Sequence, residues 1–265
     1  MQELRIAKVN GREIPVLVSD EKEALLAAKA AGGALIGLWR PGQEMDALSA
    51  ANYVVEDLAD VTDEFLERVA RRHLGLPWHI CETERLLIRE MFADDFDEVW
   101  FHQIGRGFNS VEELQAYTKN QYAFYEFGFW ALVLKETGEL VGVAGLTVPE
   151  EISENERGRV EMYELRSACS AAEGTEFGPA CGAVENAKPG AAQNATDFTN
   201  GETLELGYHI FYRCRQHGFA KEACKAILRY GAEELGAERF VVRIDHKNEE
   251  SKRLAAALGF TWPEI

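Results

Sequence analysis

The amino-acid sequence predicts an α/β protein built from two parts, on three observations. Residues 14–74 alternate short β-type runs with helical ones, which is typical of a small parallel sheet. After residue 82 the order changes to a strand, two helices and two neighbouring strands. Residues 204–259 then read as strand, turn, helix, strand and helix. We therefore expect a first part over residues 1–79 and a second over residues 80–265.

The first part contains three predicted strands and two predicted helices. The strands are the apolar runs at 14–20, 34–39 and 52–58. The helix after residue 20 is rich in Ala, Leu, Lys and Glu, and Asp20 and Glu23 have the spacing of a capping box at its start. The second helix, 62–75, has one apolar stripe, and residues 76–79 read as a linker. This order favours a small Rossmann-like parallel module.

This first part resembles the C-terminal half of haloacid-dehalogenase-like phosphatases. The resemblance lies in "VSDEKEALLAAKAAGGALIGLW" (18–39) and "ANYVVEDLADV" (51–61). That family's nucleophilic aspartate stands in a D-x-D motif after an earlier strand, whereas residues 1–13 contain no aspartate. We therefore interpret Asp20 as a helix cap rather than a magnesium ligand, and the module as non-catalytic. Phosphatase activity of this module is the alternative.

The second part contains the remaining predicted elements. Strands are expected at 83–91, at 204–211, at 239–245 and, as a pair joined by a turn at 136–138, within 129–148. Helices are expected at 92–104, 110–127, 221–236 and 249–259. Residues 151–203 are expected to be a flexible insertion, because 173–202 are rich in Gly, Ala, Asn and Thr without periodicity. The insertion is either a lid over the acceptor or a surface excursion without chemistry.

The charge and the cysteine pattern exclude several classes of function. A net charge of −17 argues against nucleic acid as a partner, because phosphate backbones bind basic surfaces. No apolar run reaches the ~20 residues of a membrane helix and no signal peptide is recognisable, so we expect no membrane partner and a cytoplasmic location. The five cysteines are scattered without a C-x-x-C pair, so we expect reduced thiols and no metal site.

The segment "RQHGFA" (215–220) gives the main chemical signal. It lies between the apolar run at 204–211 and an amphipathic helix. Amide groups at a helix start have no intrahelical partner and carry a partial positive charge, so a turn that collects them binds anions. Gly218 permits close approach to the backbone, and Arg215 adds a positive charge. The pattern favours phosphate or pyrophosphate binding, with Cys214 and Cys224 incidental to it.

Residues 83–260 resemble the GNAT superfamily of N-acetyltransferases, in particular the branch that acetylates ribosomal proteins or polyamines. "RQHGFA" matches that family's R/Q-x-x-G-x-G/A signature, and "TERLLIRE" (83–90) and "NEESKRLAAALGF" (248–260) match two further segments in the same order. The resemblance implies a mixed, mostly antiparallel central sheet flanked by helices. It also implies acetyl-CoA as co-substrate, no metal, and a small-molecule or peptide N-terminal amine as acceptor.

The resemblance further implies where acetyl-CoA binds. The strand before the cradle is expected to separate from its neighbour, so that the pantetheine arm contacts the backbone of Tyr208, His209 and Ile210. The pyrophosphate is expected to bind at Arg215, Gln216, His217, Gly218, Phe219 and Ala220. Asn248 is expected to hydrogen-bond the pantetheine arm, with Ser251 one helical turn further on. The residue pattern also fits Asn248 as a helix N-cap, and the two roles are compatible.

The attacking amine must be neutral, which requires a base or a water chain to one. Glu205 is the first candidate, because relatives often have an acid on this strand. The alternative is that Glu205 is an ordinary exposed residue of an alternating strand. His209 is the second candidate and shares the face of Glu205 if no bulge intervenes. We interpret His217 as solvent-facing.

The acceptor amine is expected between the first two helices and the strand pair of the second part. Five aromatic residues there either line an apolar slot or belong to the core: Trp100, Phe101, Tyr122, Tyr125 and Phe129. The acidic character of the chain favours a cationic acceptor.

Two features depart from the family pattern. Ala255 stands where many members have a tyrosine that protonates the leaving thiolate. The sequence ends at Ile265, where members add closing strands. The sheet is therefore either truncated, or its edge is covered by the first part or by a second copy in a homodimer. These departures motivate a rival function, a non-catalytic acyl-CoA-binding or regulatory protein.

Overall fold

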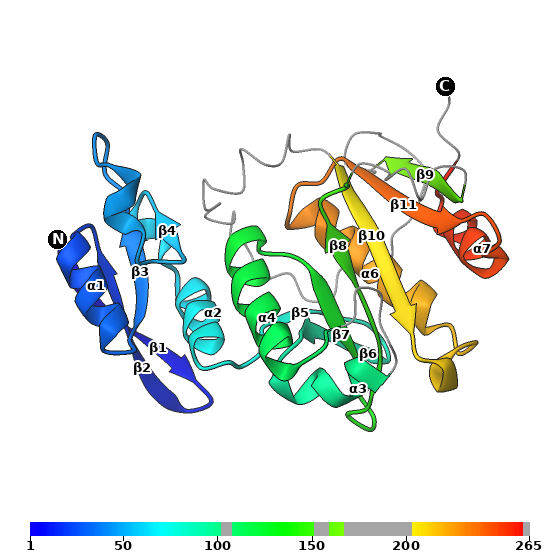
Figure 1. The fold of residues 1–265 in the computed structure, drawn as a ribbon, viewed down its shortest axis with the longest axis horizontal. Helices are drawn as coiled ribbons and strands as arrows, with labels where there is room; N and C mark the ends of the chain where they lie inside the picture. Colours follow the sequence, from blue (N-terminus) through cyan, green and yellow to red (C-terminus); the bar gives the residue numbers. More distant parts are fainter. Residues whose placement is uncertain (102–107, 151–158, 167–202, 262–265) are drawn as a thin grey trace. The chain divides into compact units, whose positions relative to one another are not determined.

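The computed structural model of the chain describes residues 1–101, 108–150, 159–166 and 203–261, without the side chains of Met45, Trp100 and Phe101. The chain forms two compact units (Figure 1). The described residues of the first unit are 1–78 and 115–126. Those of the second are 79–101, 108–114, 127–150, 159–166 and 203–261. Most of the predicted insertion, 151–158 and 167–202, lies outside the described residues.

The first unit is built on a four-stranded sheet of order β1-β2-β3-β4. Its elements are β1 (Gln2–Val9), β2 (Arg12–Ser19), α1 (Lys22–Ala30), β3 (Ala34–Leu38), η1 (Met45–Leu48), β4 (Val54–Val55), η2 (Leu58–Asp60) and α2 (Asp63–His73). The pairs β2–β3 and β3–β4 are parallel, as strand–helix alternation predicts. β4 is shorter than the predicted 52–58, because the side chain of Asp57 accepts a hydrogen bond from the amide of Ala59 and starts η2.

One edge of this sheet differs from the prediction. β1 and β2 form an antiparallel hairpin that turns at Asn10 and Gly11. Both turn residues have a positive φ, 49° and 76°, the backbone geometry that Asn-Gly favours in two-residue hairpins. The expected small parallel sheet is confirmed for β2, β3 and β4, and β1 adds an antiparallel edge strand that was not predicted. This local two-residue turn decides the antiparallel pairing of the edge strand.

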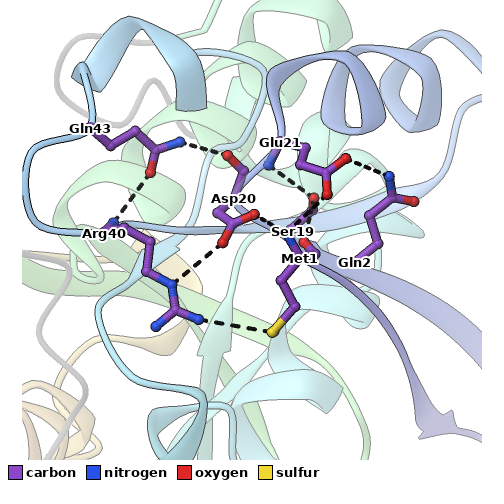
Figure 2. Close-up of polar contacts among 7 residues, drawn as sticks. All are labelled: Met1, Gln2, Ser19, Asp20, Glu21, Arg40 and Gln43. Atoms are coloured by element: carbon purple, nitrogen blue, oxygen red, sulfur yellow. Dashed lines mark hydrogen bonds and ion pairs between the residues drawn. The ribbon is translucent and has the colours of Figure 1, made fainter.

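The predicted capping role of Asp20 is also wrong. α1 has Glu21 at its N-cap, and no side chain caps it. The Asp20 carboxylate instead accepts hydrogen bonds from the amino group of Met1 and, at 3.4 Å, from Nε of Arg40 (Figure 2). Its backbone carbonyl accepts a third bond from the Gln43 amide at 2.6 Å. The bond from Met1, ahead of that from Arg40, holds the pKa of Asp20 below its ordinary value, so the residue is a hub of polar contacts.

The helix predicted at 62–75 is confirmed as α2. Thr62 caps it, with its hydroxyl accepting a hydrogen bond from the Phe65 amide at 3.1 Å. Leu66, Val69 and Ala70 are its buried residues. They share one core with the buried side chains of the sheet, Val9, Val16, Val18, Ile36 and Leu38 among them. The single apolar stripe of the helix thus covers one face of this sheet.

The second unit is built on a seven-stranded sheet of order β5-β6-β7-β8-β10-β11-β9. Its strands are β5 (His79–Glu82), β6 (Leu86–Glu90), β7 (Phe129–Leu134), β8 (Leu140–Thr147), β9 (Val160–Arg166), β10 (Thr203–Ile210) and β11 (Arg239–Asp245). Its helices are η3 (Ala93–Asp95), α3 (Phe96–Phe101), the start of α4 (Val111–Tyr125), η5 (Tyr212–Cys214), α6 (Phe219–Glu233) and α7 (Glu249–Ala257). Among the strands that the structure describes here, only β10 and β11 form a parallel pair. The predicted mixed, mostly antiparallel sheet with flanking helices is confirmed.

Two strands of this sheet were not predicted. β5 begins at His79, where a linker was expected, and pairs with β6. β9 lies inside the predicted insertion and pairs antiparallel with β11 along its whole length. Thr261 adds a single antiparallel bridge to Glu164 of β9. The edge of β11 is therefore covered by an earlier segment of the same chain, and the argument for a homodimer from an open edge no longer holds.

α6 lies against one face of this sheet, on β5, β6, β8 and β10, and α7 lies against β11 (Figure 1). A Cβ on Gly231 of α6 would meet the side chains of Leu146 and Phe240 at 2.7 and 2.8 Å, so this glycine allows close packing of helix on sheet. Tyr230 makes an edge-on contact with Trp130, which is fully buried. The sheet residues that alternate with Leu146 therefore point to the opposite face.

Candidate functional site

β10 and β11 separate part of the way along their length. Their parallel ladder joins Thr203, Leu204 and Glu205 to residues 239–241 and then stops. β10 runs on to Ile210 and β11 to Asp245, each still paired with its other neighbour. The backbone edge of β10 beyond Glu205 thus has no ladder partner on the side of β11 in the described part of the chain. This is the opening that the sequence predicts before the cradle, and an extended ligand could pair with it.

Glu205, Gly207 and His209 share one face of β10, because the register against β8 is continuous from Glu205 to Ile210. The condition for His209 to lie on the face of Glu205 is therefore met. A Cβ on Gly207 would come within 2.6 Å of the ring of Phe129. The Phe129 ring thus covers the strand between the two candidate bases, on the face opposite α6.

Glu205 is held by an arginine that the sequence interpretation did not single out. Nε of Arg243, on β11, donates to Oε1 of Glu205 at 2.7 Å. The Glu205 side chain is only 12% exposed, so it is not an ordinary exposed residue of an alternating strand. Its second oxygen, Oε2, is buried and has no hydrogen-bond partner among the described residues. A buried acceptor without a donor is costly, so this oxygen is suited to a ligand N–H or a water.

The segment after β10 turns into α6 at the place where the sequence predicts an anion cradle. Gln216 and Gly218 both adopt left-handed φ values, 64° and 83°, on either side of His217. α6 begins at Phe219, and its first bond back to the turn joins the Glu222 amide to the Gly218 carbonyl at 3.1 Å. The amides that precede Glu222 at this helix start have no acceptor within the described ranges. Alternating left-handed residues at a helix start make a concave set of N–H groups that binds anions.

The side chains of the cradle differ in part from the expectation. Arg215 is exposed, but its Nε donates to the carbonyl of Ile210 at 3.2 Å and so ties the turn to the end of β10. One acceptor position of the Ile210 backbone is thereby already used. His217 is exposed, as predicted, with Nδ1 2.7 Å from the Arg215 carbonyl oxygen and its ring stacked on Phe219.

A second arginine lies at the cradle and was missed. Nη1 of Arg85, in the connection between β5 and β6, donates to the carbonyl of His217 at 3.0 Å. Glu222, on the first turn of α6, accepts from Nε of Arg85 at 2.8 Å and from the hydroxyl of Thr83 at 2.5 Å. Thr83 and Arg85 belong to "TERLLIRE", which the sequence analysis matched to the family only as a segment. The sequence alone gave no sign that this segment reaches residue 217.

The start of α7 confirms one prediction and brings two site candidates together. Asn248 is the N-cap, with Oδ1 accepting from the Ser251 amide at 3.1 Å. The Ser251 hydroxyl lies 2.9 Å from the hydroxyl of Tyr208 on β10. Burial raises the pKa of Tyr208, so its hydroxyl stays protonated at neutral pH. Ala255, one turn after Ser251, is buried and offers no polar group.

The cysteines in this region play a packing role. Cys214 and Cys224 are buried free thiols, and Cys224 lies on the apolar face of α6. Complete burial raises the pKa of the Cys224 thiol to about 12, which makes it a poor nucleophile and a poor metal ligand. Among the described residues there is no cluster of three or more His, Cys, Asp or Glu side chains that could hold a metal ion. No helix there is long and apolar enough to cross a membrane.

The predicted aromatic slot stays a prediction. The side chains of Trp100 and Phe101 are outside the description. Tyr122 and Tyr125 belong to the first unit and Phe129 to the second. Tyr122 is buried and meets the ring of Tyr117 edge-on at 5.8 Å, as a core residue does.

Comparison with known proteins connects this region to acetyltransferases. A family model described as an acetyltransferase (GNAT) domain matches residues 173–261. The matched segment includes β10, the cradle, α6, β11 and α7. The model does not extend to the first unit's residues 1–78, so the resemblance of that unit to haloacid-dehalogenase-like phosphatases stays a prediction.

Three solved structures illustrate what the chain is similar to. An acetyltransferase of the GNAT family from Bacillus anthracis is 19% identical over 67% of this chain and 81% of that one, with a TM-score of 0.42. A GNAT-family acetyltransferase from Bordetella pertussis is 21% identical over 70% and 90%, with a TM-score of 0.44. RimL, a ribosomal L7/L12 alpha-N-protein acetyltransferase in complex with coenzyme A, is 14% identical over 69% and 84%, with a TM-score of 0.43.

Proposed function

We propose that this protein is an acetyl-CoA-dependent N-acetyltransferase that acetylates a primary amine. The observation that carries the proposal is the combination of an unpaired strand edge, β10 beyond Glu205, with an exposed amide cradle at the end of the same strand. An extended arm that ends in a diphosphate fits both features at once. The match of residues 173–261 to an acetyltransferase (GNAT) domain supports the same assignment.

The residues fit the groups of this co-substrate. The amides of residues 216–220 suit the pyrophosphate, and the backbone edge at Tyr208 and His209 suits the pantetheine amides. Asn248 still has its side-chain NH₂ available after capping α7 and is a further donor. Acetyl-CoA supplies the acetyl group as a thioester.

The chain's own contribution to the reaction is proton transfer and positioning. In the proposed reaction the amine nitrogen bonds to the acetyl carbon, and the bond from that carbon to sulfur breaks. The proton released by the amine is taken by Oε2 of Glu205, directly or through a water, with His209 as the second candidate base. The thiolate takes a proton from solvent or from a neighbouring hydroxyl, because Ala255 has none to give.

The Arg243–Glu205 ion pair also supports a second candidate function. A carboxylate that is bound by an arginine can serve structure alone. In addition, Ala255 stands where many family members have the tyrosine that protonates the leaving thiolate. A non-catalytic acyl-CoA-binding or regulatory protein would retain the cradle without turnover. For the proposed enzyme, the acceptor is either a small-molecule amine or a peptide N-terminus, and the same experiment distinguishes these two classes.

Calorimetric titration with coenzyme A and thiol release from acetyl-CoA separate these candidates. We expect the full chain to bind coenzyme A and to release thiol with at least one amine of a panel of polyamines, amino acids and peptides with free N-termini. Binding without turnover on any amine would favour the non-catalytic function. Absence of coenzyme A binding would overturn both. Gly218→Val is the binding-deficient control, because a β-branched residue is strained at φ 83°.

A further inference from the structure

We propose that Arg85 is a positioning residue of the coenzyme A site, which sets the direction of the Gly218 amide through the carbonyl of His217. The inference rests on the proposed function, because it concerns the same cradle. Arg85 lies 132 positions before His217 in the sequence, and its Nη1 donates to the His217 carbonyl at 3.0 Å.

The cradle lacks a cap of its own. Gly218 occupies the N-cap position of α6, so no side chain there can bind the first amides of the helix. Gln216 and Gly218 both have left-handed φ values, and for Gln216 this conformation costs about 1–2 kcal/mol. A turn with a strained residue and no cap needs an external contact to hold one backbone arrangement.

Arg85 supplies that contact through the peptide plane. The peptide between His217 and Gly218 is trans, so its carbonyl and its N–H point in opposite directions. Because Arg85 holds the carbonyl, the N–H of Gly218 points away from Arg85. The hydrogen bond therefore selects which side of the turn presents this donor.

Arg85 is itself fixed on three sides. Glu222 accepts from its Nε at 2.8 Å and from its backbone amide at 2.9 Å. The guanidinium also lies over the ring of Phe219, 4.6 Å from the centroid. Burial opposes ionisation of Glu222, but hydrogen bonds from Thr83 and Arg85 outweigh it and lower the pKa of the carboxyl. Glu222 is thus ionised at neutral pH and keeps the arginine in place.

The test measures whether Arg85 contributes to binding of the diphosphate group of coenzyme A rather than to binding of its pantetheine arm. Four full-length variants are compared with the native chain: Arg85→Met, Arg85→Lys, Glu222→Gln and, as the matched control, Arg213→Met. Arg213 is a similarly exposed arginine of η5, but it pairs with Glu98 and Glu139, and within the described part of the chain it makes no hydrogen bond to His217. Each variant is titrated with coenzyme A and with pantetheine, and is assayed with acetyl-CoA and with acetyl-pantetheine.

We expect Arg85→Met to weaken coenzyme A binding and to raise the KM for acetyl-CoA by about tenfold, the value of one oriented hydrogen bond to a charged group. Pantetheine binding and kcat are expected to change less than about twofold. Arg85→Lys and Glu222→Gln should give intermediate losses, and Arg213→Met none. Glu222→Gln keeps the test open if Arg85→Met does not fold.

Equal weakening of coenzyme A and pantetheine by Arg85→Met would overturn the inference, because a general loss of structure acts on both ligands. No weakening of either would overturn it too, while leaving the proposed function intact. Failure of the native chain to bind coenzyme A is the distinct result that removes the proposed function itself.

Discussion

Nε of Arg243 donates a 2.7 Å hydrogen bond to Oε1 of Glu205, at the point where the ladder between β10 and β11 ends. The pair spans the two strands, with the Glu205 side chain 12% exposed and that of Arg243 21% exposed. Oε1 thus accepts the hydrogen bond that joins the two strands. Oε2 is buried without a protein donor among the described residues. In the proposed function Oε1 serves the fold and Oε2 accepts the amine proton, and the first two predictions test this division.

Glu205→Gln should lower the rate of acetyl transfer by about a hundredfold or more, because an amide cannot accept the amine proton. Coenzyme A binding should be unchanged, since Glu205 is not part of the cradle. The measurement is kcat with the best amine of the panel, together with a calorimetric Kd. Glu161→Gln on β9 is the matched control, because Glu161 is likewise paired, with Lys252, but β11 separates its strand from β10. Full activity of Glu205→Gln would assign the carboxylate to structure alone.

Arg243→Met should lower the free energy of unfolding by about 3 kcal/mol, because it leaves the Glu205 carboxylate buried without its partner. In a chain that already has Glu205→Gln, Arg243→Met should lower the free energy of unfolding by clearly less. Denaturant unfolding of the two single variants and the double variant gives the coupling between the residues. Additive losses would mean that the 2.7 Å contact contributes nothing to stability.

Gly218→Ala should cost about 1–2 kcal/mol of stability and weaken coenzyme A binding, because alanine is strained at φ 83°. Gln216→Gly should change stability by less than about 1 kcal/mol, since relief of its own strain offsets the extra entropy of glycine in the unfolded chain. Thermal unfolding and calorimetric titration check both. Equal losses at the two positions would contradict the left-handed conformation of residue 216.

Gly207→Ala should cost about 1–3 kcal/mol, because the new methyl group would lie 2.6 Å from the Phe129 ring. Phe129→Leu in the same chain should recover part of this loss by withdrawing the ring. Denaturant unfolding of the single and double variants measures the recovery. If the double variant is no more stable than Gly207→Ala, the ring does not cover this position.

Because Glu222 is ionised in the folded chain, the stability of the fold should decrease at acid pH. Its pKa is lower in the folded chain than the ordinary 4.5, so it stabilises the fold above pH 4.5 and this contribution is lost as pH falls through the lower folded value. Glu222→Gln should be less stable than the native chain by about 1–3 kcal/mol at pH 7. The difference should shrink below pH 4.5. Thermal unfolding between pH 7 and pH 3.5 provides the check, and a constant difference would refute the ionised contact.

Local signals sufficed for most of the elements and for the turn that precedes α6. α2 and the N-cap at Asn248 follow from apolar stripes and capping residues that lie next to each other in the chain. The turn at 215–220 is marked by local residues too, although its contact with Arg85 is not local. The spacing of apolar residues also distinguishes helices from strands in both units, and the α/β class follows from the order of these elements.

Where sequence interpretation failed, a partner far along the chain decided the outcome. Asp20 looks like a cap, but the contacts of Met1 and Arg40 draw its carboxylate away from α1 (Figure 2). β9 lies inside the predicted insertion, and it pairs with β11 along its whole length. Such pairing depends on distant residues that no local pattern contains.

The sequence by itself determined the α/β class and the position of the tight turn before α6, because adjacent residues decide how a turn and a helix start form. Only the tertiary structure decided that β10 and β11 part at Glu205, that Arg243 holds this carboxylate, and that Arg85 reaches the carbonyl of His217. The physical reason is that a hydrogen bond depends on separation in space. Only folding brings Arg85 and His217, which are 132 positions apart in the sequence, within hydrogen-bond distance.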